Sequence, residues 1–218
     1  MAEQSRTLKV VNQGPDLTTL AKNRFSLQVA KSVIKDGELH FNVVWKSQVL
    51  APVMQVKWKP TYGLNWTSEV PSPGLMITLG GFWKQCDPGQ VLDIDETGQW
   101  MQSTATPVKD YLSVGSNNYS IPEVNGIHIV VGVQSAPGNF DIIYVDETEL
   151  GKGMTAQYQP QEQIQWWYQT GMRSSTMIEQ ASTKKETGDY SAPDSRTGTY
   201  SKTSSYSYTT GTWKTSSP

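Results

Sequence analysis

The sequence lacks several residue types on which common enzyme and metal sites depend. It has one cysteine, Cys86, and two histidines, His40 and His128, among 218 residues. A single cysteine excludes an intramolecular disulfide and any zinc site built from several cysteines. Neither histidine belongs to a catalytic or metal-binding motif, and no nucleophile can be paired with a base. We therefore expect the protein not to be an enzyme.

Strong charge and long apolar runs are also missing. The chain has 18 Lys and Arg against 20 Asp and Glu, a formal net charge of -2. This balance offers no electrostatic surface for nucleic acid or for an anionic membrane. No apolar run reaches the roughly 20 residues of a membrane-spanning helix, and the polar N-terminus shows no signal peptide. These absences predict a cytoplasmic protein that binds neither nucleic acid nor membranes.

Short alternating runs separated by glycine and proline dominate the rest of the chain. The sequence has 18 Gly and 12 Pro between runs that alternate apolar and polar residues. Because successive side chains of a strand point to opposite faces, these runs predict half-buried strands. Asp36 and Gly37 suit a hairpin turn, and residues 16–22 suit a short helix capped by Asp16. The predicted strands cover residues 8–12, 24–33, 38–47, 54–59, 75–79, 127–134, 140–145 and 163–168.

This pattern predicts an all-β fold, an antiparallel β-sandwich or barrel with at most one short helix. We expect one domain over residues 1–218, with its core in residues 1–172. Residues 173–218 are rich in Ser and Thr, a composition that favours disorder. Tyr206, Tyr208 and Trp213, however, alternate with β-favouring threonines. We therefore predict a late strand or hairpin over residues 199–215, packed on its own chain or on a partner.

Aromatic side chains that carry a polar group are the unusual feature of the composition. There are 8 Trp and 10 Tyr but only 4 Phe. Such side chains suit positions with one apolar side and one hydrogen-bonded end, at the margin of a core or in a binding site. The alternative is that they fill the core, as large aromatic side chains usually do. The residues predicted to bind a ligand are Trp58, Tyr62, Trp66, Trp83, Trp166, Trp167 and Tyr168.

These rings predict a site for a small planar ligand. The tryptophans would stack on it, while Tyr62 or Tyr168 would orient its polar atoms. Gly80 and Gly81, just before Trp83, would let a ligand or a backbone segment come close. Aromatic-rich strand edges also favour self-association, so a homodimer stays open as an alternative to a monomer.

Two acidic turns are the only candidates for a metal site. Asp93, Asp95 and Glu96, with Asp146 and Glu147, offer the hard oxygen ligands that calcium prefers. Their spacing lacks the glycine and the terminal glutamate of a twelve-residue calcium loop. We therefore predict no bound metal and interpret these groups as solvated turn carboxylates, with calcium as the alternative.

Residues 44–52, continuing through Trp58 to Trp66 and then over residues 81–86, resemble the small β-rich proteins that are abundant in mushroom fruiting bodies. Within that group the chain is most similar to the chromoproteins. The resemblance implies a fungal, non-enzymatic protein that holds a small planar organic chromophore. A defence lectin is the nearest alternative, with Asn117, Asn118 and Asp141 around the rings. A further alternative is a membrane-active β-type toxin that inserts residues 199–215.

Overall fold

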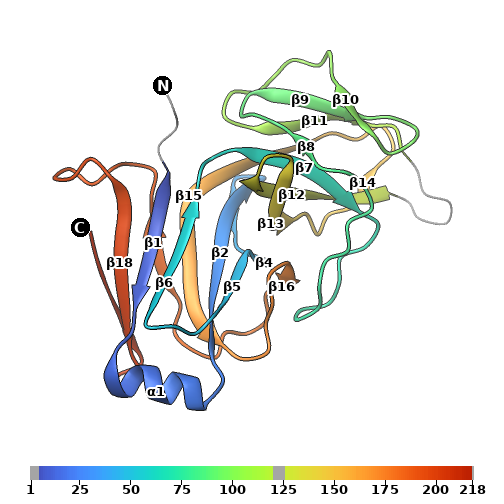
Figure 1. The fold of residues 1–218 in the computed structure, drawn as a ribbon. Helices are drawn as coiled ribbons and strands as arrows, with labels where there is room; N and C mark the ends of the chain where they lie inside the picture. The colour runs from blue at the N-terminus through green and yellow to red at the C-terminus, as the bar shows by residue number, and fades with distance from the viewer. Residues whose placement is uncertain (1–4, 120–125, 218) are drawn as a thin grey trace.

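The computed structural model describes residues 5–119 and 126–217. It is 52% strand and 4% helix (Figure 1), which confirms the predicted all-β fold with one short helix. The helix is α1 (Gly14–Lys22). The strands are β1 (Arg6–Val11), β2 (Ser26–Lys35), β3 (Glu38–His40), β4 (Val43–Val44), β5 (Lys46–Val49), β6 (Val53–Trp58), β7 (Tyr62–Thr67), β8 (Lys84–Gln85), β9 (Gln90–Ile94), β10 (Trp100–Gln102), β11 (Leu112–Asn117), β12 (Gly126–Ala136), β13 (Asn139–Val145), β14 (Leu150–Gly151), β15 (Ala156–Gln169), β16 (Thr176–Met177), β17 (Glu186–Asp189), β18 (Tyr200–Ser207) and β19 (Thr212–Ser216).

The strands form three larger sheets and one small ladder. A four-stranded sheet has the order β19-β18-β1-β6, and a five-stranded sheet has the order β13-β12-β7-β8 with β14 beside β12. An eight-stranded sheet has the order β10-β9-β11-β15-β2-β3, with β17 beside β15 and β5 beside β2. The small ladder pairs β16 with β4. Most ladders are antiparallel, but β1 pairs with β18 and β11 pairs with β9 in parallel.

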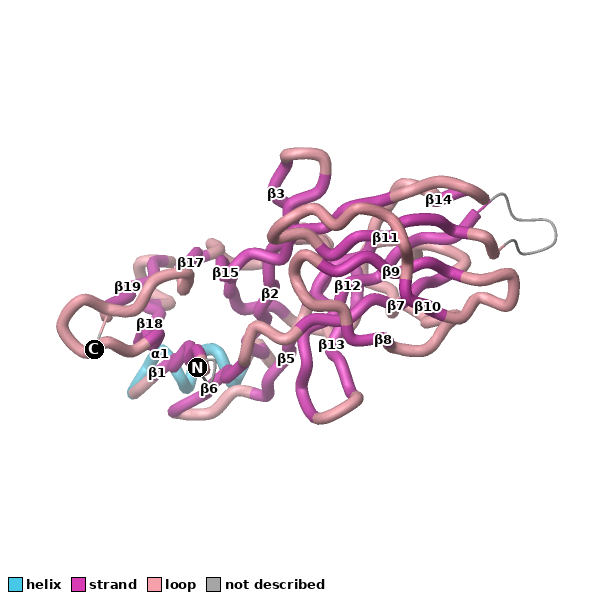
Figure 2. The backbone as a smooth tube through the Cα atoms, turned by 90° about the horizontal axis from the view of Figure 1, so that it is seen from above, coloured by secondary structure: helices cyan, strands magenta, loops and turns pink. Residues whose placement is uncertain are grey.

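Strand β15 connects the two ends of the molecule. Its first residues pair with β11, and its last residues pair with β2 and β17. The register with β2 shifts between Pro160 and Ile164, where a bulge accommodates a proline that has no N–H for the ladder. Figure 2 shows β1, β6, β18 and β19 at one end and β7 to β11 at the other. The bulge thus allows one long strand to pair with strands at both ends of the molecule.

The apolar faces of the three sheets meet in one continuous core. Period-two alternation places every second side chain of β1, β2 and β12 on that face. The following residues of these strands are completely buried in it: Leu8, Val10, Leu27, Val29, Ile127, Ile129, Val131 and Val133.

Two predicted strands differ from the structure. Residues 75–79 form no strand: Met76 makes a single bridge to Thr176, and its side chain is exposed. Residues 38–47 are divided among β3, β4 and β5, because Asn42 interrupts the ladder and donates its Nδ2 hydrogen bond to the carbonyl of Val145 at 2.7 Å. After this break β4 pairs with β16, whereas β3 and β5 both pair with β2.

The predicted helix cap was wrong. Helix α1 begins at Gly14, and Gln13 occupies the N-cap position without a side-chain hydrogen bond. Asp16 lies within the first turn, where its carboxylate accepts the backbone N–H of Tyr208 at 2.8 Å. The partner of Asp16 is thus 192 residues away, which a local sequence pattern does not reveal.

Residues 199–215 contain the β18–β19 hairpin, which packs on its own chain. Strand β18 lies between β1 and β19. The ring of Trp213 stacks on Tyr168, with 5.3 Å between centroids and 16° between planes, and also contacts Tyr206 at 4.9 Å. Its Nε1 donates to the carbonyl of Lys184 at 2.8 Å. Trp213 therefore anchors the Ser/Thr-rich segment to the core.

Replacing this anchor should destabilise the whole fold. Trp213→Ala removes a buried ring and leaves a cavity, so we expect the free energy of unfolding to fall by about 3–4 kcal/mol. Urea denaturation measures the change. The control is Val49→Ala, because Val49 is 89% exposed on β5 and should shift stability by less than about 0.5 kcal/mol. Equal effects of the two substitutions would contradict the anchoring role.

Candidate functional site

The structure does not gather the seven predicted ligand-binding residues around one cavity. Trp58 ends β6, Tyr62 and Trp66 lie on β7, and three others lie on β15. Trp83, just before β8, is half-buried. The other six are between 0% and 6% exposed: Trp58, Tyr62, Trp66, Trp166, Trp167 and Tyr168. Most of these rings therefore pack inside the protein.

Trp66 occupies the space that the neighbouring glycines provide. A Cβ atom at Gly80 would lie 2.2 Å from Cζ3 of Trp66, and one at Gly81 would lie 2.4 Å from its Nε1. The Trp66 Nε1 donates to the carbonyl of Gly98 at 2.9 Å, and the ring lies 4.9 Å from that of Tyr119. The glycines thus admit an indole of the same chain in place of a ligand.

The remaining rings also contact protein groups. Trp166 and Tyr168 belong to the main core, while Trp167 belongs to a separate cluster, as the alternation of a strand requires. The ammonium group of Lys185 lies 4.8 Å from the centre of the Trp167 ring. Trp83 packs against Phe140, with 5.4 Å between ring centroids.

Trp58 and Tyr62 meet at a buried carboxylate. We name the group formed by Arg6, Lys31, Trp58, Tyr62 and Glu162 the Glu162 cluster. Oε2 of Glu162 accepts a hydrogen bond from Trp58 Nε1 and forms an ion pair with Arg6 Nε, each at 2.8 Å. Oε1 accepts from Lys31 Nζ at 2.9 Å and from the Tyr62 hydroxyl. The five side chains come from β1, β2, β6, β7 and β15, so all three larger sheets contribute.

Burial sets the charges of the Glu162 cluster. The Lys31 side chain is 0% exposed, and burial lowers its pKa to about 8, although the nearby Glu162 opposes the shift. Burial alone would raise the pKa of Glu162. The charge of Lys31 and the hydrogen bonds from Tyr62, Trp58 and Lys31 outweigh that effect and hold this pKa below its usual value. Because Lys31 has no access to solvent, the cluster has a structural role and does not contact a ligand through this lysine.

Trp58 also lines a hollow of about 460 Å³, and we name it the Trp58 hollow. Trp45 and Trp58 line it with their rings perpendicular, 5.5 Å between centroids and 87° between planes. The other lining residues are Ser5, Lys46, Lys57, Lys59, Gln134, Ser135, Ala136, Pro137 and Asp141. Of the seven predicted residues, only Trp58 lines this hollow.

The Trp58 hollow is cationic although the chain as a whole is slightly acidic. Three lysines and one aspartate line it, and Lys46 pairs with Asp141 at 2.6 Å. Within the described residues, the buried Nε1 of Trp45 has no hydrogen-bond partner. A buried donor without a partner carries a desolvation cost. The hollow itself offers an apolar wall and positive charge to a ligand.

Sequence reasoning missed most of this site. In its predicted strand Trp45 shares a parity with apolar residues, which indicates a core position. No sequence pattern links it to the three lysines of the hollow, Lys46, Lys57 and Lys59. Of the three residues proposed for a lectin, Asp141 lines the hollow, while Asn117 is buried and donates to the carbonyl of Leu150 at 2.9 Å. Asn118 is half-buried.

The prediction of solvated carboxylates in the acidic turns is wrong for Asp146, which is buried and accepts the hydroxyl of Tyr158 at 2.6 Å and the N–H of Thr148 at 2.9 Å. Asp95 bonds the backbone of its own turn. Oδ1 of Asp95 accepts the N–H groups of Thr97 at 2.8 Å and Gln99 at 3.0 Å. These hydrogen bonds lower the pKa of Asp95, with that from Gln99 having the largest effect. In residues 5–119 and 126–217, no group of three or more His, Cys, Asp or Glu side chains lies close enough to hold a metal ion. Cys86 is buried, and burial raises its pKa to about 12, so the thiol keeps its proton at neutral pH.

No protein-family model, curated protein or solved structure matches the chain. In the described part of the chain, no helix is both long enough and apolar enough to cross a membrane. The interpretation of the site therefore depends on its own geometry.

Removing the Glu162 charge should strongly destabilise the protein. In Glu162→Gln the buried ammonium of Lys31 loses its counter-charge, which should lower the free energy of unfolding by about 3–5 kcal/mol at pH 7. The double variant Lys31→Met with Glu162→Gln should recover part of this loss, because it removes the unpaired charge as well. Urea denaturation of both proteins tests this. A double variant that is less stable than Glu162→Gln would contradict the role assigned to the pair.

The same carboxylate should make stability sensitive to acid. The folded-state pKa of Glu162 is lower than its ordinary value of 4.5, so the unfolded state binds more protons in this range. The contribution of Glu162 is therefore present above pH 4.5 and is lost as the pH falls through the folded-state pKa. Glu162→Gln should show a shallower loss of stability in acid than wild type. Glu38→Gln, at an exposed position of β3, is the control and should follow wild type.

Proposed function

We propose that the protein is a non-enzymatic carrier of a small, planar, negatively charged aromatic ligand that binds in the Trp58 hollow. One observation carries this proposal: two indoles and three lysines line the same opening. Each of these groups favours a different property of such a ligand.

The size and walls of the hollow favour a small aromatic molecule. Its volume of about 460 Å³ lies within the range of about 300–1,000 Å³ that is usual for small-molecule sites. Trp45 and Trp58 are held rigidly, because Trp58 donates to Glu162 and the two rings contact each other edge to face. Rigid aromatic walls bind flat ligands with little loss of conformational entropy.

The charges favour an acidic group on the ligand. Lys57 and Lys59 are exposed at the rim, and Lys46 is half-buried beside Asp141. A carboxylate or phenolate would interact favourably with these ammonium groups. A conjugated acid of this kind absorbs at long wavelength, which agrees with the chromophore implied by the resemblance to mushroom chromoproteins.

The toxin alternative has less support. Insertion of residues 199–215 into a membrane would separate Trp213 and Tyr206 from Tyr168. The rings of Trp213 and Tyr206 would lose this packing during the transition. Strand β18 also forms ladder hydrogen bonds on both of its edges, with β1 on one edge and with β19 on the other.

Material purified from its natural source should absorb beyond the protein band, and the absorbance should elute with the protein in gel filtration. Native mass spectrometry should then report one bound small molecule per chain. A colourless preparation with no bound mass would contradict the pigment.

Ligand-free protein should bind naphthalene sulfonate, an anionic planar probe, and should bind the cationic probe proflavine more weakly. The double variant Lys57→Met with Lys59→Met should raise the dissociation constant of the anionic probe by about tenfold, since each exposed charge contributes up to about 1 kcal/mol. Calorimetric titration at low and high salt measures it. Lys152→Met, on an exposed turn, is the matched control, and an effect of equal size there would contradict the assigned site.

A further inference from the structure

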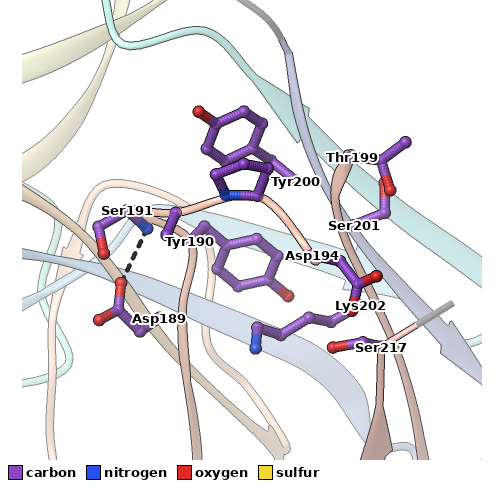
Figure 3. Close-up of a pocket in the computed structure, with 11 residues that line it drawn as sticks. Asp189, Tyr190, Ser191, Asp194, Thr199, Tyr200, Ser201, Lys202 and Ser217 are labelled. Carbon is purple, nitrogen blue, oxygen red and sulfur yellow. Dashed lines mark hydrogen bonds between the residues drawn. The ribbon is translucent and has the colours of Figure 1, made fainter. Parts of the chain in front are cut away.

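A second hollow lies at the start of the Ser/Thr-rich segment, between the end of β17 and the start of β18. It has a volume of about 260 Å³ and is lined by residues 189–194, 199–202 and Ser217 (Figure 3). We name it the Tyr190 hollow. Two contacts join its wall to the Glu162 cluster. The backbone N–H of Tyr190 donates to the carbonyl of Glu162 at 2.8 Å. The guanidinium of Arg6 lies 4.8 Å from the centre of the Tyr200 ring.

Tyr190 provides a buried polar group without a partner. Its side chain is 1% exposed, and within the described residues its hydroxyl has no hydrogen bond. Burial raises its pKa, so the hydroxyl is protonated and is able both to donate and to accept. Figure 3 shows it directed toward the side of the hollow where Asp194, Lys202 and Ser217 lie. Buried hydroxyls in native proteins are nearly always paired, so this one indicates a group supplied from outside the chain.

The neighbouring side chains add donors and acceptors at fixed positions. Lys202 places its ammonium 5.6 Å from the centre of the Tyr190 ring, and no carboxylate in the described residues pairs with it within 4.0 Å. Oδ1 of Asp189 accepts the N–H of Ser191 at 2.8 Å (Figure 3). Oδ1 of Asp194 accepts the N–H of Arg196 at 2.9 Å. These bonds orient both carboxylates. Within the described residues they leave Oδ2 of Asp189 available to accept a hydrogen bond.

This combination fits a neutral ligand with several hydroxyl groups. Two aspartates and one lysine give the lining an excess of one negative charge, which disfavours an anion, and Lys202 disfavours an amine. Hydroxyl groups can donate to the carboxylates and accept from Lys202, while Tyr190 can do either. The volume suits a single sugar ring more than a drug-sized molecule.

We propose that the Tyr190 hollow is a second binding site, distinct from the Trp58 hollow, and that it takes one unit of a neutral sugar. The site does not depend on the proposed carrier function, because the two hollows share no lining residue.

The test measures binding of methyl glycosides of glucose, galactose, mannose, fucose and N-acetylglucosamine by saturation-transfer NMR and calorimetric titration. At least one should bind the full-length protein. Tyr190→Phe should weaken that binding about fivefold, the loss of one neutral hydrogen bond, and Lys202→Met should weaken it at least tenfold. Tyr208→Phe, an exposed tyrosine of the same segment, should bind as wild type does.

Thermal unfolding supplies a second readout. Tyr190→Phe should leave the melting temperature unchanged or slightly raised, because the lost hydroxyl has no partner to give up. Tyr158→Phe should lower it, because the Tyr158 hydroxyl donates to Asp146 at 2.6 Å. The sugar site is overturned if no glycoside binds, if both site variants bind as wild type does, or if Tyr190→Phe destabilises as much as Tyr158→Phe. Preferential binding of tetramethylammonium over every glycoside would also overturn it. Binding of naphthalene sulfonate should be the same in Tyr190→Phe and wild type, which separates this result from the carrier function.

Discussion

The carboxylate of Glu162 joins the three larger sheets of the molecule. It accepts hydrogen bonds from Lys31, Trp58 and Tyr62 and pairs with the charge of Arg6. These four residues come from four other strands. It stands at the bulge of β15, where the register with β2 shifts and the strand passes from one end of the molecule to the other. A buried charge tolerates few arrangements of its partners, because each missing donor leaves it unsatisfied. This requirement restricts the relative position of the three sheets.

Both hollows are consequences of that arrangement. The ring of Trp58 contacts Trp45 on the side of one hollow and Tyr190 on the side of the other, while its Nε1 is held by Glu162. Each hollow is lined by a residue with a buried polar atom that has no partner in the described residues: Trp45 with its Nε1, and Tyr190 with its hydroxyl.

The aromatic residues show where sequence reasoning works and where it ends. Alternation correctly indicated strands around Leu27 and Ile129, because burial of one face leaves a period of two in the sequence. The same composition did not separate core rings from site rings. Trp66 fills space left by glycines, and Trp166 packs in the core. Trp45 belongs to the same core and also lines a hollow. Residues 75–79 carry apolar residues but form a single bridge, from Met76 to Thr176 of β16, in place of a ladder.

The sequence by itself determined the all-β class, the single short helix and the ordered hairpin near the C-terminus, because these depend on local patterns of burial and on the preferences of β-branched and aromatic residues. Only the tertiary structure decided that Glu162 meets Lys31 across 131 residues, and that lysines of β5 and β6 share one opening with two indoles. Contacts between distant segments depend on strand order and on the bulge in β15, and neither leaves a periodic signal in the chain.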